Sequence, residues 1–412
     1  MKNQTLYNDL LVALDVGTTK ISVLIAQKIA DDGLSIIGIG EAPAYGVSRG
    51  VVVDIAQAVD SIKLAVKEAE LMAGHKVETA VVGTTGAHIQ SLTSTGMIPI
   101  KNGQIRPHDI TAVLAAARAI VLPEGQQILH VLPQYYTIDS SHRVTDPEGM
   151  FGVRLEAQVY IITGASASTQ NLVRCCQTAG VAVSDLVLQP LASADAVLSR
   201  DERELGIGVL DIGGGSSDFA IYQQGTIRHT KIFPIAGNYI THDIALCLRT
   251  TLKDAERVKR TYGSTLRKLF TADEQIEVEM VHGEELTTVT PDEITRIIEP
   301  RVAELLAMVQ KDIKTNHLEH LMPAGIVLTG GGSLLHGIQE SAEFTLKVPA
   351  RVGVPHVPPM YKEALANPTY ATCYGLLLHA LKKSKGSTAY SLSGPAVSQI
   401  MNRMKSWVAD FF

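Results

Sequence analysis

The sequence is poor in cysteine, in aromatic residues and in excess basic charge, and each shortage excludes a class of protein. Its four cysteines, Cys175, Cys176, Cys247 and Cys373, show no CxxC spacing, which favours buried reduced thiols over zinc ligands or disulfides. Aromatic residues make up 5% of the chain and the net charge is −6, whereas a nucleic-acid binder has a basic domain with stacking aromatics. We therefore expect no nucleic-acid partner.

Long apolar runs are also missing. No stretch approaches the roughly 20 apolar residues of a membrane-spanning helix. The start of the chain lacks the basic and apolar regions of a signal peptide, so we expect a cytosolic protein. The 412 residues, 46% of them hydrophobic, can bury the cores of roughly two to four domains.

The most informative stretch is a glycine turn in the middle of the chain. An apolar run, Ile207 to Leu210, ends in Asp211, and Gly213, Gly214, Gly215, Ser216 and Ser217 follow before a second strand-like run. Glycines let backbone N–H groups converge on phosphate, the serines add donors, and Asp211 can hold Mg²⁺ through water. Taken alone, such a turn is more often a structural hairpin.

The motif occurs twice. Its first copy comprises the strand Leu10 to Leu14, the turn residues Asp15, Gly17, Thr18 and Thr19, and the returning strand Ile21 to Ile25. The two aspartates lie 196 residues apart, which indicates an internal duplication of two similar halves. Two such hairpins facing each other would grip one nucleotide. Lys20 either adds charge toward the phosphates or is an exposed strand lysine.

A third glycine turn follows a buried strand near the end of the chain. Gly330, Gly331, Gly332 and Ser333 come after the run Gly325 to Leu328, and a helix is predicted from Leu335. Three such turns in one chain favour nucleotide binding over structural hairpins.

The remaining pattern alternates strands with helices, which predicts α/β domains. The clearest helix spans Ile55 to Ala73 and ends at Gly74. From about Gly86 the pattern is shorter and more polar, with a helix from Pro107 and strand pieces at 127–132, 135–138 and 157–163, which predicts a small α+β insertion. A long helix is predicted from Pro291 to about Ile313.

The chain ends in an amphipathic segment behind a polar tether of about 13 residues that reaches about 20 Å. Its apolar face comprises Val397, Ile400, Met401, Met404, Trp407, Val408, Phe411 and Phe412. Docking on the protein's own core or in a partner's groove stays open, but tryptophan with basic neighbours favours a membrane surface. Because ordering costs about 1 kcal/mol per residue, one tail should attach reversibly, and stable attachment would need several tails on one assembly.

Several motifs resemble those shared by actin, sugar kinases and heat-shock chaperone ATPases. These are the phosphate-1 motif at 15–19, the phosphate-2 motif at 211–218, the adenosine motif at 329–332 and the connecting segment Gln189-Pro-Leu-Ala-Ser-Ala194. Narrower matches at 48–54, 146–156 and 162–164, together with the tethered terminal helix, resemble the FtsA family of bacterial cell-division proteins over essentially the whole chain.

The resemblance implies an α/β, actin-like, two-lobed fold of duplicated ribonuclease-H-like domains, with a small α+β insertion and a C-terminal amphipathic helix. The implied divisions are 1–85, 166–205 and 365–383 for the first lobe (1A), 86–165 for the inserted subdomain (1C), 206–240 and 300–364 for the second lobe (2A), 241–299 for subdomain 2B, 384–396 for a flexible linker and 397–412 for the membrane-targeting helix.

The resemblance also implies a site for ATP and Mg²⁺. It places Asp15 and Asp211 at Mg²⁺ through water, Gly17, Thr18, Gly213, Gly214 and Gly215 at the phosphates, Glu256 and Lys259 at the ribose or adenine, and Gly330, Gly331 and Gly332 at the base, with Thr19, Lys20, Ser216, Gly237 and Ser333 completing the set. Judged by spacing alone, Glu256 and Lys259 are a surface ion pair. Gln189 matches a residue that orients the attacking water, and because glutamine is no carboxylate base, we expect weak ATPase activity at most.

The implied function is that of a polymer that ties the FtsZ ring to the inner face of the cytoplasmic membrane. The membrane contact would be made by Ile400, Met401, Met404, Trp407, Val408, Phe411 and Phe412. The implied partners are the C-terminal peptide of FtsZ near 240–300, later division proteins at 86–165, further copies of the chain and anionic lipid. Arg296 and Arg301 are predicted FtsZ contacts because their helix face is expected to be basic and exposed. The alternatives are an actin-like component of type IV pilus assembly and a small-molecule kinase of the same fold.

Overall fold

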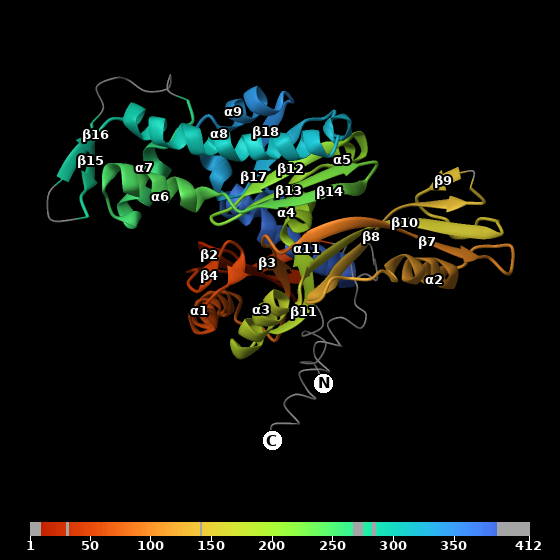
Figure 1. Cartoon of the computed structure of the whole chain (residues 1–412). Coiled ribbons are helices and arrows are strands. Elements are labelled where there is room, and N and C mark those ends of the chain that lie inside the picture. The colour runs from red at the N-terminus through yellow and green to blue at the C-terminus, as the bar shows by residue number, and fades with distance from the viewer. Residues whose placement is uncertain (1–9, 30–32, 141, 267–274, 282–285, 385–412) are drawn as a thin grey trace.

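Two five-stranded sheets form the centres of two lobes (Figure 1). This computed structural model describes residues 10–29, 33–140, 142–266, 275–281 and 286–384. The first sheet contains, in spatial order, β11 (Ala182–Leu188), β6 (Thr79–Thr84), β1 (Leu10–Val16), β2 (Lys20–Lys28) and β3 (Leu34–Pro43). The second contains β18 (Ala350–Val352), β17 (Ile326–Thr329), β12 (Ile207–Ile212), β13 (Ser217–Gln223) and β14 (Thr226–Phe233).

The two sheets share one topology. In each, the first three strands along the chain pair antiparallel, and two later strands add in parallel beside the first. This agrees with the duplication that the repeated glycine turn predicts.

The alternation of side chains along the central strands decides which residues face the space between the lobes. Ala13 of β1 and Val209 of β12 belong to one hydrophobic core that lies between the two sheets. The residues that follow them, Leu14 and Leu210, belong to the outer cores of the first and second lobes. Since successive side chains of a strand point to opposite faces, the aspartate that follows each of these leucines points back between the lobes.

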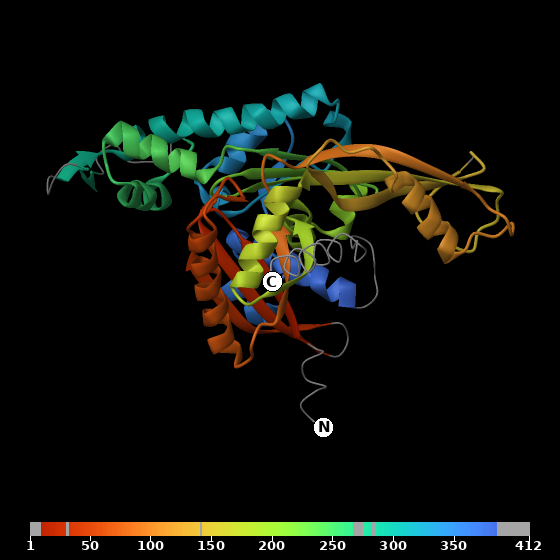
Figure 2. The same ribbon diagram turned by 60° about the horizontal axis from the view of Figure 1, so that its bottom comes forward.

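Helices cover both faces of each sheet. The outer face of the first sheet carries α1 (Ile55–Ala73) and α3 (Ser166–Thr178). The outer face of the second carries α6 (Gly237–Leu248), α7 (Leu252–Tyr262), α8 (Pro291–Thr315) and α9 (Ile338–Leu346). Figure 2 shows α8, in cyan, lying across the second lobe. The space between the sheets holds α4 (Gln189–Val197) and α11 (Ala371–Ser384).

The helices α4 and α11 touch through their backbones. A Cβ atom added to Gly375 of α11 would lie 1.8 Å from the carbonyl oxygen of Ala192 in α4. A side chain larger than hydrogen would therefore force the two helices apart at this point.

Helix α1 forms where the sequence predicts it. Asp54 caps its start by accepting a hydrogen bond from the Gln57 N–H at 3.1 Å. Gly74 ends it in the left-handed conformation, with φ of 69°. Its buried residues recur at intervals of three and four and pack on the first sheet.

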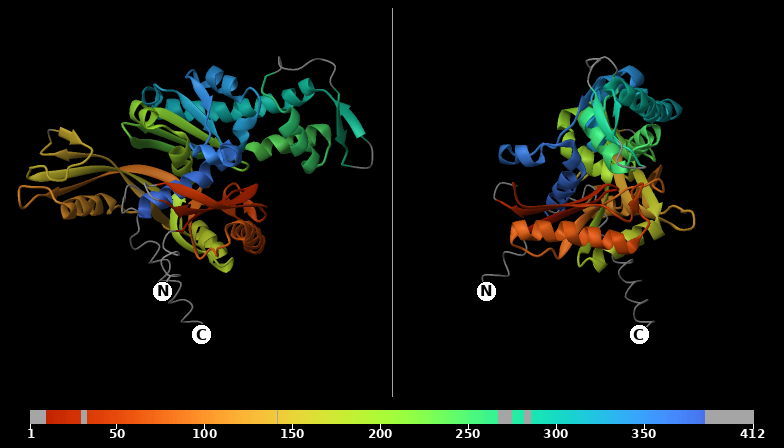
Figure 3. Two further views of the ribbon diagram at one scale, coloured as in Figure 1. Left: turned by 180° about the vertical axis from the view of Figure 1, so that it is seen from behind. Right: turned by 90° about the vertical axis from the view of Figure 1, so that its left-hand side faces the viewer.

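The inserted segment forms a separate sheet that projects from the lobes (Figures 1 and 3). It contains, in spatial order, β7 (Gln90–Pro99), β10 (Arg154–Ala165), β8 (Gln126–Ile138) and β9 (His142–Val144), with α2 (Pro107–Arg118) packed against it. The strand pieces predicted at 127–132 and 135–138 are one strand, because β8 continues through Pro133 with an irregular register against β10.

The insertion is fastened to the edge of the second lobe. The Tyr160 hydroxyl of β10 accepts the Thr230 N–H of β14 at 2.8 Å and donates to Ser91 Oγ at 2.6 Å. Gln134 of β8 donates to the Ile227 carbonyl at 3.0 Å. Because these groups are largely buried, breaking one contact leaves an unpaired polar atom.

At the opposite end of the molecule, β15 (Ile276–Glu279) and β16 (Leu286–Val289) lie beyond α7 (Figure 1). The remaining short strands and α-helices are β4 (Val47–Ser48), β5 (Val51–Val52), α5 (Arg200–Leu205) and α10 (Lys362–Leu365). None of the helices within the described ranges is long and apolar enough to cross a membrane.

Candidate functional site

The two duplicated glycine turns have the same geometry. The Gly17 N–H donates to the Lys20 carbonyl at 3.1 Å, and the Gly213 N–H donates to the Ser216 carbonyl at 3.0 Å. In each case a hairpin closes directly after the aspartate strand, at the pairs Val16 with Ile21 and Ile212 with Ser217.

The two turns face each other across the space between the lobes. A Cβ atom added to Gly214 would lie 2.3 Å from Thr19 Cγ2, and one added to Gly215 would lie 2.4 Å from Thr18 Oγ1. Thr18 Oγ1 in turn accepts the Gly50 N–H at 3.0 Å. A Cβ atom at either position would therefore force the first turn to shift, because the backbone of the second turn lies directly against the threonine side chains of the first.

Three carboxylates converge beneath the turns: Asp15, Asp211 and Asp218. Burial, and then the charge of Asp211, raise the pKa of Asp15 to about 7. The same two causes raise the pKa of Asp218 to about 7. Burial raises the pKa of Asp211 as well. A cation would relieve this repulsion, which is the electrostatic setting of a metal–phosphate site.

Each predicted metal carboxylate is held by the helices between the lobes. Gln189, the first residue of α4, donates to Asp15 Oδ1 at 2.8 Å. Ser193, one turn further along α4, donates to Asp211 Oδ2. Thr372 of α11 donates to the same oxygen at 3.0 Å. One face of α4 thus reaches the carboxylates of both lobes.

Asp218 is a site residue that the sequence reasoning missed. Thr85, just after β6 of the first lobe, donates to Asp218 Oδ2 of the second lobe at 2.7 Å, and both residues are buried. The Oδ1 atom of Asp218 is buried without a hydrogen-bond partner among the described residues. The hairpin pattern could have identified it, because Asp218 stands directly opposite Asp211 on the neighbouring strand, just as Ser22 stands opposite Asp15 in the first copy of the motif.

A second polar cluster lies against the second glycine turn. The first N–H group of α6, from Gly237, donates to the Gly213 carbonyl at 3.0 Å. Lys259 of α7 is 2.6 Å from Glu256 and donates to Thr241 Oγ1 at 2.8 Å and to the Gly237 carbonyl at 3.2 Å. Its side chain is only 12% exposed, and burial lowers its pKa. The interpretation as a surface ion pair does not fit this placement.

The third glycine turn lies beside Asp211. Gly330 has φ of 77°, and a Cβ atom there would lie 2.2 Å from Asp211 Oδ1. Ser333 Oγ donates to the Gly330 carbonyl at 2.7 Å. The helix predicted from Leu335 begins only at Ile338, because residues 331–334 form a 3-10 turn and Leu335 is extended.

A small apolar crevice opens next to this turn. It is lined by Ile212, Ile240, Val302, Leu305, Gly332, Leu335 and Ile338, among others. A flat, weakly polar group is the chemistry that suits such a wall.

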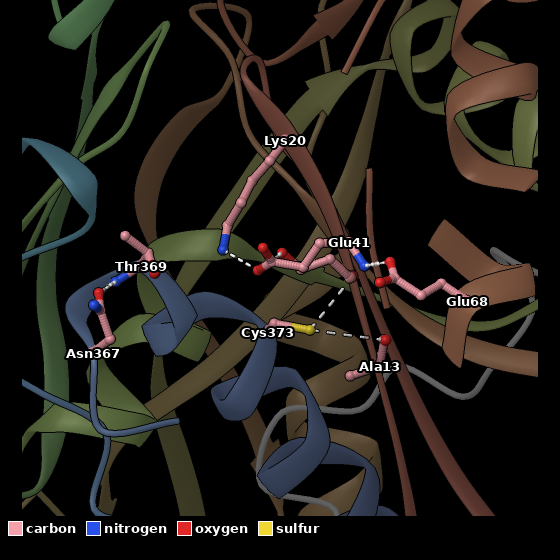
Figure 4. A network of polar contacts seen from close by, with 8 residues as sticks. Ala13, Lys20, Glu41, Glu68, Asn367, Thr369 and Cys373 are labelled. Carbon is pink, nitrogen blue, oxygen red and sulfur yellow. Dashed lines mark hydrogen bonds and ion pairs between the residues drawn. The ribbon is translucent and has the colours of Figure 1, made fainter. Parts of the chain in front are cut away.

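Lys20 lies in a different network from the one that the sequence predicts. Its ammonium group pairs with Glu41 (Figure 4), and it lies 4.2 Å from the centroid of the Tyr370 ring. Glu68 accepts the Glu41 N–H at 2.7 Å. Lys20 still acts on the carboxylate beside it, since its charge lowers the pKa of Asp15 against the larger effect of burial.

The two arginines predicted to contact a partner differ in their surroundings. Arg296 is 64% exposed and pairs with Asp292 of its own helix at 2.7 Å. Arg301 is 25% exposed and makes two contacts with Asp243 of α6, at 2.6 and 2.9 Å. The expected exposed face therefore holds for Arg296, while Arg301 ties α8 to α6. The predicted membrane residues at 397–412 lie outside the described residues.

Comparisons with known proteins agree on a family. Residues 208–375 match the family model described as "Cell division protein FtsA", and residues 86–163 match "SHS2 domain inserted in FTSA". A "Cell division protein FtsA" of Pseudomonas aeruginosa is 42% identical over 409 residues, covering 98% of each chain. One of Escherichia coli K12 is 33% identical over 413 residues and again covers 98% of both.

Solved structures show the same architecture at lower identity. A "PilM-PilN type IV pilus biogenesis complex" chain has a TM-score of 0.64 at 20% identity, covering 90% of this chain and 98% of that one. "MreB5 of Spiroplasma citri bound to ADP" has a TM-score of 0.56 at 16% identity, covering 92% and 98%. These likenesses show the fold alone and confirm the predicted actin-like arrangement, while the match of residues 86–163 confirms the predicted insertion.

Proposed function

The chain belongs to the FtsA family of cell division proteins, and from this premise we propose that it binds ATP with Mg²⁺ between its two lobes and ties the FtsZ ring to the inner face of the cytoplasmic membrane. The observation that carries the nucleotide proposal is the pair of glycine turns that face each other above Asp15 and Asp211.

The donor set fits a magnesium nucleotide. Mg²⁺ is usually held by one or two carboxylates, several waters and the phosphates themselves, not by a cage of protein ligands. Asp15, Asp211 and Asp218 do not by themselves form such a cage, and neither does any other group of three or more His, Cys, Asp or Glu side chains in the described part of the chain. When bound, Mg²⁺ would neutralise phosphate charge, and Asp15 and Asp211 would hold its waters.

The rest of the nucleotide has a place in the same lobe. Backbone N–H groups of the glycine turns would bind the phosphates, while Glu256 and Lys259 would contact the ribose or adenine. Gly332 of the third glycine turn borders the apolar crevice that would receive the base. Gln189, held on Asp15, would orient a water but cannot deprotonate it as a carboxylate would, so we expect turnover to be weak.

The nucleotide proposal is tested by Asp211→Ala. We expect the variant to lose binding of a fluorescent ATP analogue in Mg²⁺ buffer, because it removes both the carboxylate and the anchor of Ser193 and Thr372. Asp201→Ala, at an exposed position of α5, is the matched control and should bind like the parent chain. Unchanged affinity in Asp211→Ala would remove this residue from the site.

The membrane proposal rests on the sequence of the tail, whose apolar face carries the only tryptophan of the chain. Several tails on one assembly would attach more firmly than one, which predicts self-association. Full-length chain and a chain ending at Pro395 are spun down with phosphatidylglycerol-containing vesicles, with phosphatidylcholine vesicles as the control. Only the full chain should pellet with the anionic vesicles, and equal pelleting of both chains would refute the anchor.

Two partner proposals accompany this role: the C-terminal peptide of FtsZ near 240–300, and later division proteins at 86–165. Arg296→Glu tests the first by fluorescence anisotropy with the peptide, because its exposed side chain can change without breaking the contact between α8 and α6. Unchanged peptide affinity would exclude Arg296. A type IV pilus role is the second candidate because such proteins share the nucleotide motifs, and a tail that proved unnecessary for vesicle binding would favour it.

A further inference from the structure

Three oxygen atoms meet at a point where the two connecting helices approach the second lobe. Ser193 Oγ and Thr372 Oγ1 both lie within hydrogen-bond distance of Asp211 Oδ2, and the two hydroxyl oxygens are 2.9 Å from each other. Ser193 is fully buried. The group therefore links α4, α11 and the end of β12 in one closed triangle.

The hydroxyl groups of Ser193 and Thr372 supply two hydrogen atoms for the three contacts of this triangle. While Asp211 carries its charge, both hydroxyls gain most by donating to its oxygen, because a hydrogen bond to a charged acceptor is about twice as strong as a neutral one. Both donors then go to Oδ2. The other oxygen, Oδ1, faces Gly330, where a Cβ atom would lie only 2.2 Å away.

We propose that Ser193 and Thr372 are positioning residues for Mg²⁺: they fix the rotation of the Asp211 carboxylate so that Oδ1 is presented to the waters of the metal. This rests on the proposed binding of magnesium nucleotide and extends it to two residues that touch neither nucleotide nor metal. It also makes the first turn of α11 part of the metal site.

The same residues connect the metal site to the packing between the lobes. Ser193 lies four residues after Gln189, so one face of α4 carries the donor to Asp211 and the donor to Asp15. In α11, Thr372 is followed by Cys373, whose thiol lies 3.5 Å from the Ser22 carbonyl of the first lobe. Each helix thus contacts the polar groups of both lobes within its first two turns.

The test compares full-length variants by the tightening that Mg²⁺ gives to nucleotide binding. Thr372→Val removes the hydroxyl at nearly constant volume, Thr372→Ser keeps it, and Ser193→Ala removes the second donor. Ser384→Ala, at the far end of α11, is the matched control. The dissociation constant of a fluorescent ATP analogue is measured in saturating Mg²⁺ and in EDTA, and the ratio of the two is the Mg²⁺ factor.

We expect Thr372→Val and Ser193→Ala to lose about ten-fold of the Mg²⁺ factor, the scale of one hydrogen bond to a charged group, with affinity in EDTA changed less than about two-fold. Thr372→Ser and Ser384→Ala should keep the parent factor. Equal weakening in Mg²⁺ and EDTA would show a merely structural role and overturn the proposal, as would an unchanged factor in Thr372→Val and Ser193→Ala. If the parent chain binds no ATP in either buffer, the proposed function itself fails, which is a separate result.

Discussion

Replacing Gly330 by alanine should damage the candidate nucleotide site more than the same change at the neighbouring Gly331. Gly330 has φ of 77° and ψ of 171°, a backbone region that essentially only glycine adopts and that costs a residue with a Cβ about 1–3 kcal/mol. The added methyl group would also lie 2.2 Å from Asp211 Oδ1 and 2.7 Å from the Ile212 carbonyl. At Gly331 the nearest atom would be Thr369 Cγ2 at 3.6 Å, an ordinary contact.

The size of the effect follows from what must move. Asp211 has to turn away from the methyl group, which breaks the hydrogen bonds from Ser193 and Thr372, each worth about 1.5–3 kcal/mol because the acceptor is charged. Partial relaxation of the turn recovers some of this. We expect Gly330→Ala to lower the free energy of unfolding by about 2–4 kcal/mol, and to weaken binding of a fluorescent ATP analogue in Mg²⁺ at least ten-fold.

Thermal unfolding and nucleotide titration of the two alanine variants, prepared side by side, test whether the contact between Gly330 and Asp211 supports the site. Gly331→Ala should melt within a degree or two of the parent chain and keep more of the analogue affinity than Gly330→Ala, because it neither strains the backbone nor meets Asp211. If Gly330→Ala behaves like Gly331→Ala in both measurements, the contact between the third glycine turn and Asp211 does not support the site.

Three further predictions concern contacts between the parts of the molecule. Thr85→Val should lower the free energy of unfolding by about 1–3 kcal/mol in a denaturant titration, because it leaves the Asp218 carboxylate buried without its donor. An unchanged midpoint of the titration would show that this contact between the lobes does not stabilise the fold. In EDTA, the melting temperature should fall as the pH rises from about 4 to about 7, because the pKa values of Asp15 and Asp218 are raised to about 7 in the folded chain and the unfolded chain releases those protons first. Asp218→Asn should flatten this dependence of the melting temperature on pH. A variant whose melting temperature changes with pH as steeply as that of the parent chain would contradict the prediction. Tyr160→Phe should lower the free energy of unfolding by about 1–3 kcal/mol, because it leaves the buried Thr230 N–H without an acceptor, and it should speed hydrogen exchange at that amide. An unaltered exchange rate would show that the Tyr160 hydroxyl does not hold the insertion to the second lobe.

The parts of the fold that the sequence predicts well are those decided by local pattern. Helix α1 has apolar residues at helical spacing and Gly74 at its end, and the structure places its bounds at the predicted residues. Strand β7 was missed because most of its residues are exposed, Leu92 and Met97 among them, so it lacks the clear apolar and polar alternation of a half-buried strand. Its pairing with β10 supplies the information that its own residues do not.

The residues of the candidate site likewise fall into those that a local sequence pattern identifies and those that only tertiary contacts identify. Asp15, Asp211 and the three glycine turns are recognisable because each belongs to a short, contiguous motif. Thr85 and Thr372 are not, since they reach the carboxylates from segments more than a hundred residues away in sequence. A hydroxyl that acts through such a contact carries no local signature, so only the folded chain identifies it.

The glycine contact between α4 and α11 has a mechanical consequence. Helices normally lock through ridges of side chains that fit into grooves, and such packing favours particular crossing angles. Where Gly375 of α11 meets Ala192 of α4, the backbones of the two helices are in direct contact. The two helices are also tied by polar contacts on both sides of Gly375, from Thr372 to Ser193 and from Lys382 to Asp195, so a side chain at Gly375 would push apart helices that these contacts hold together.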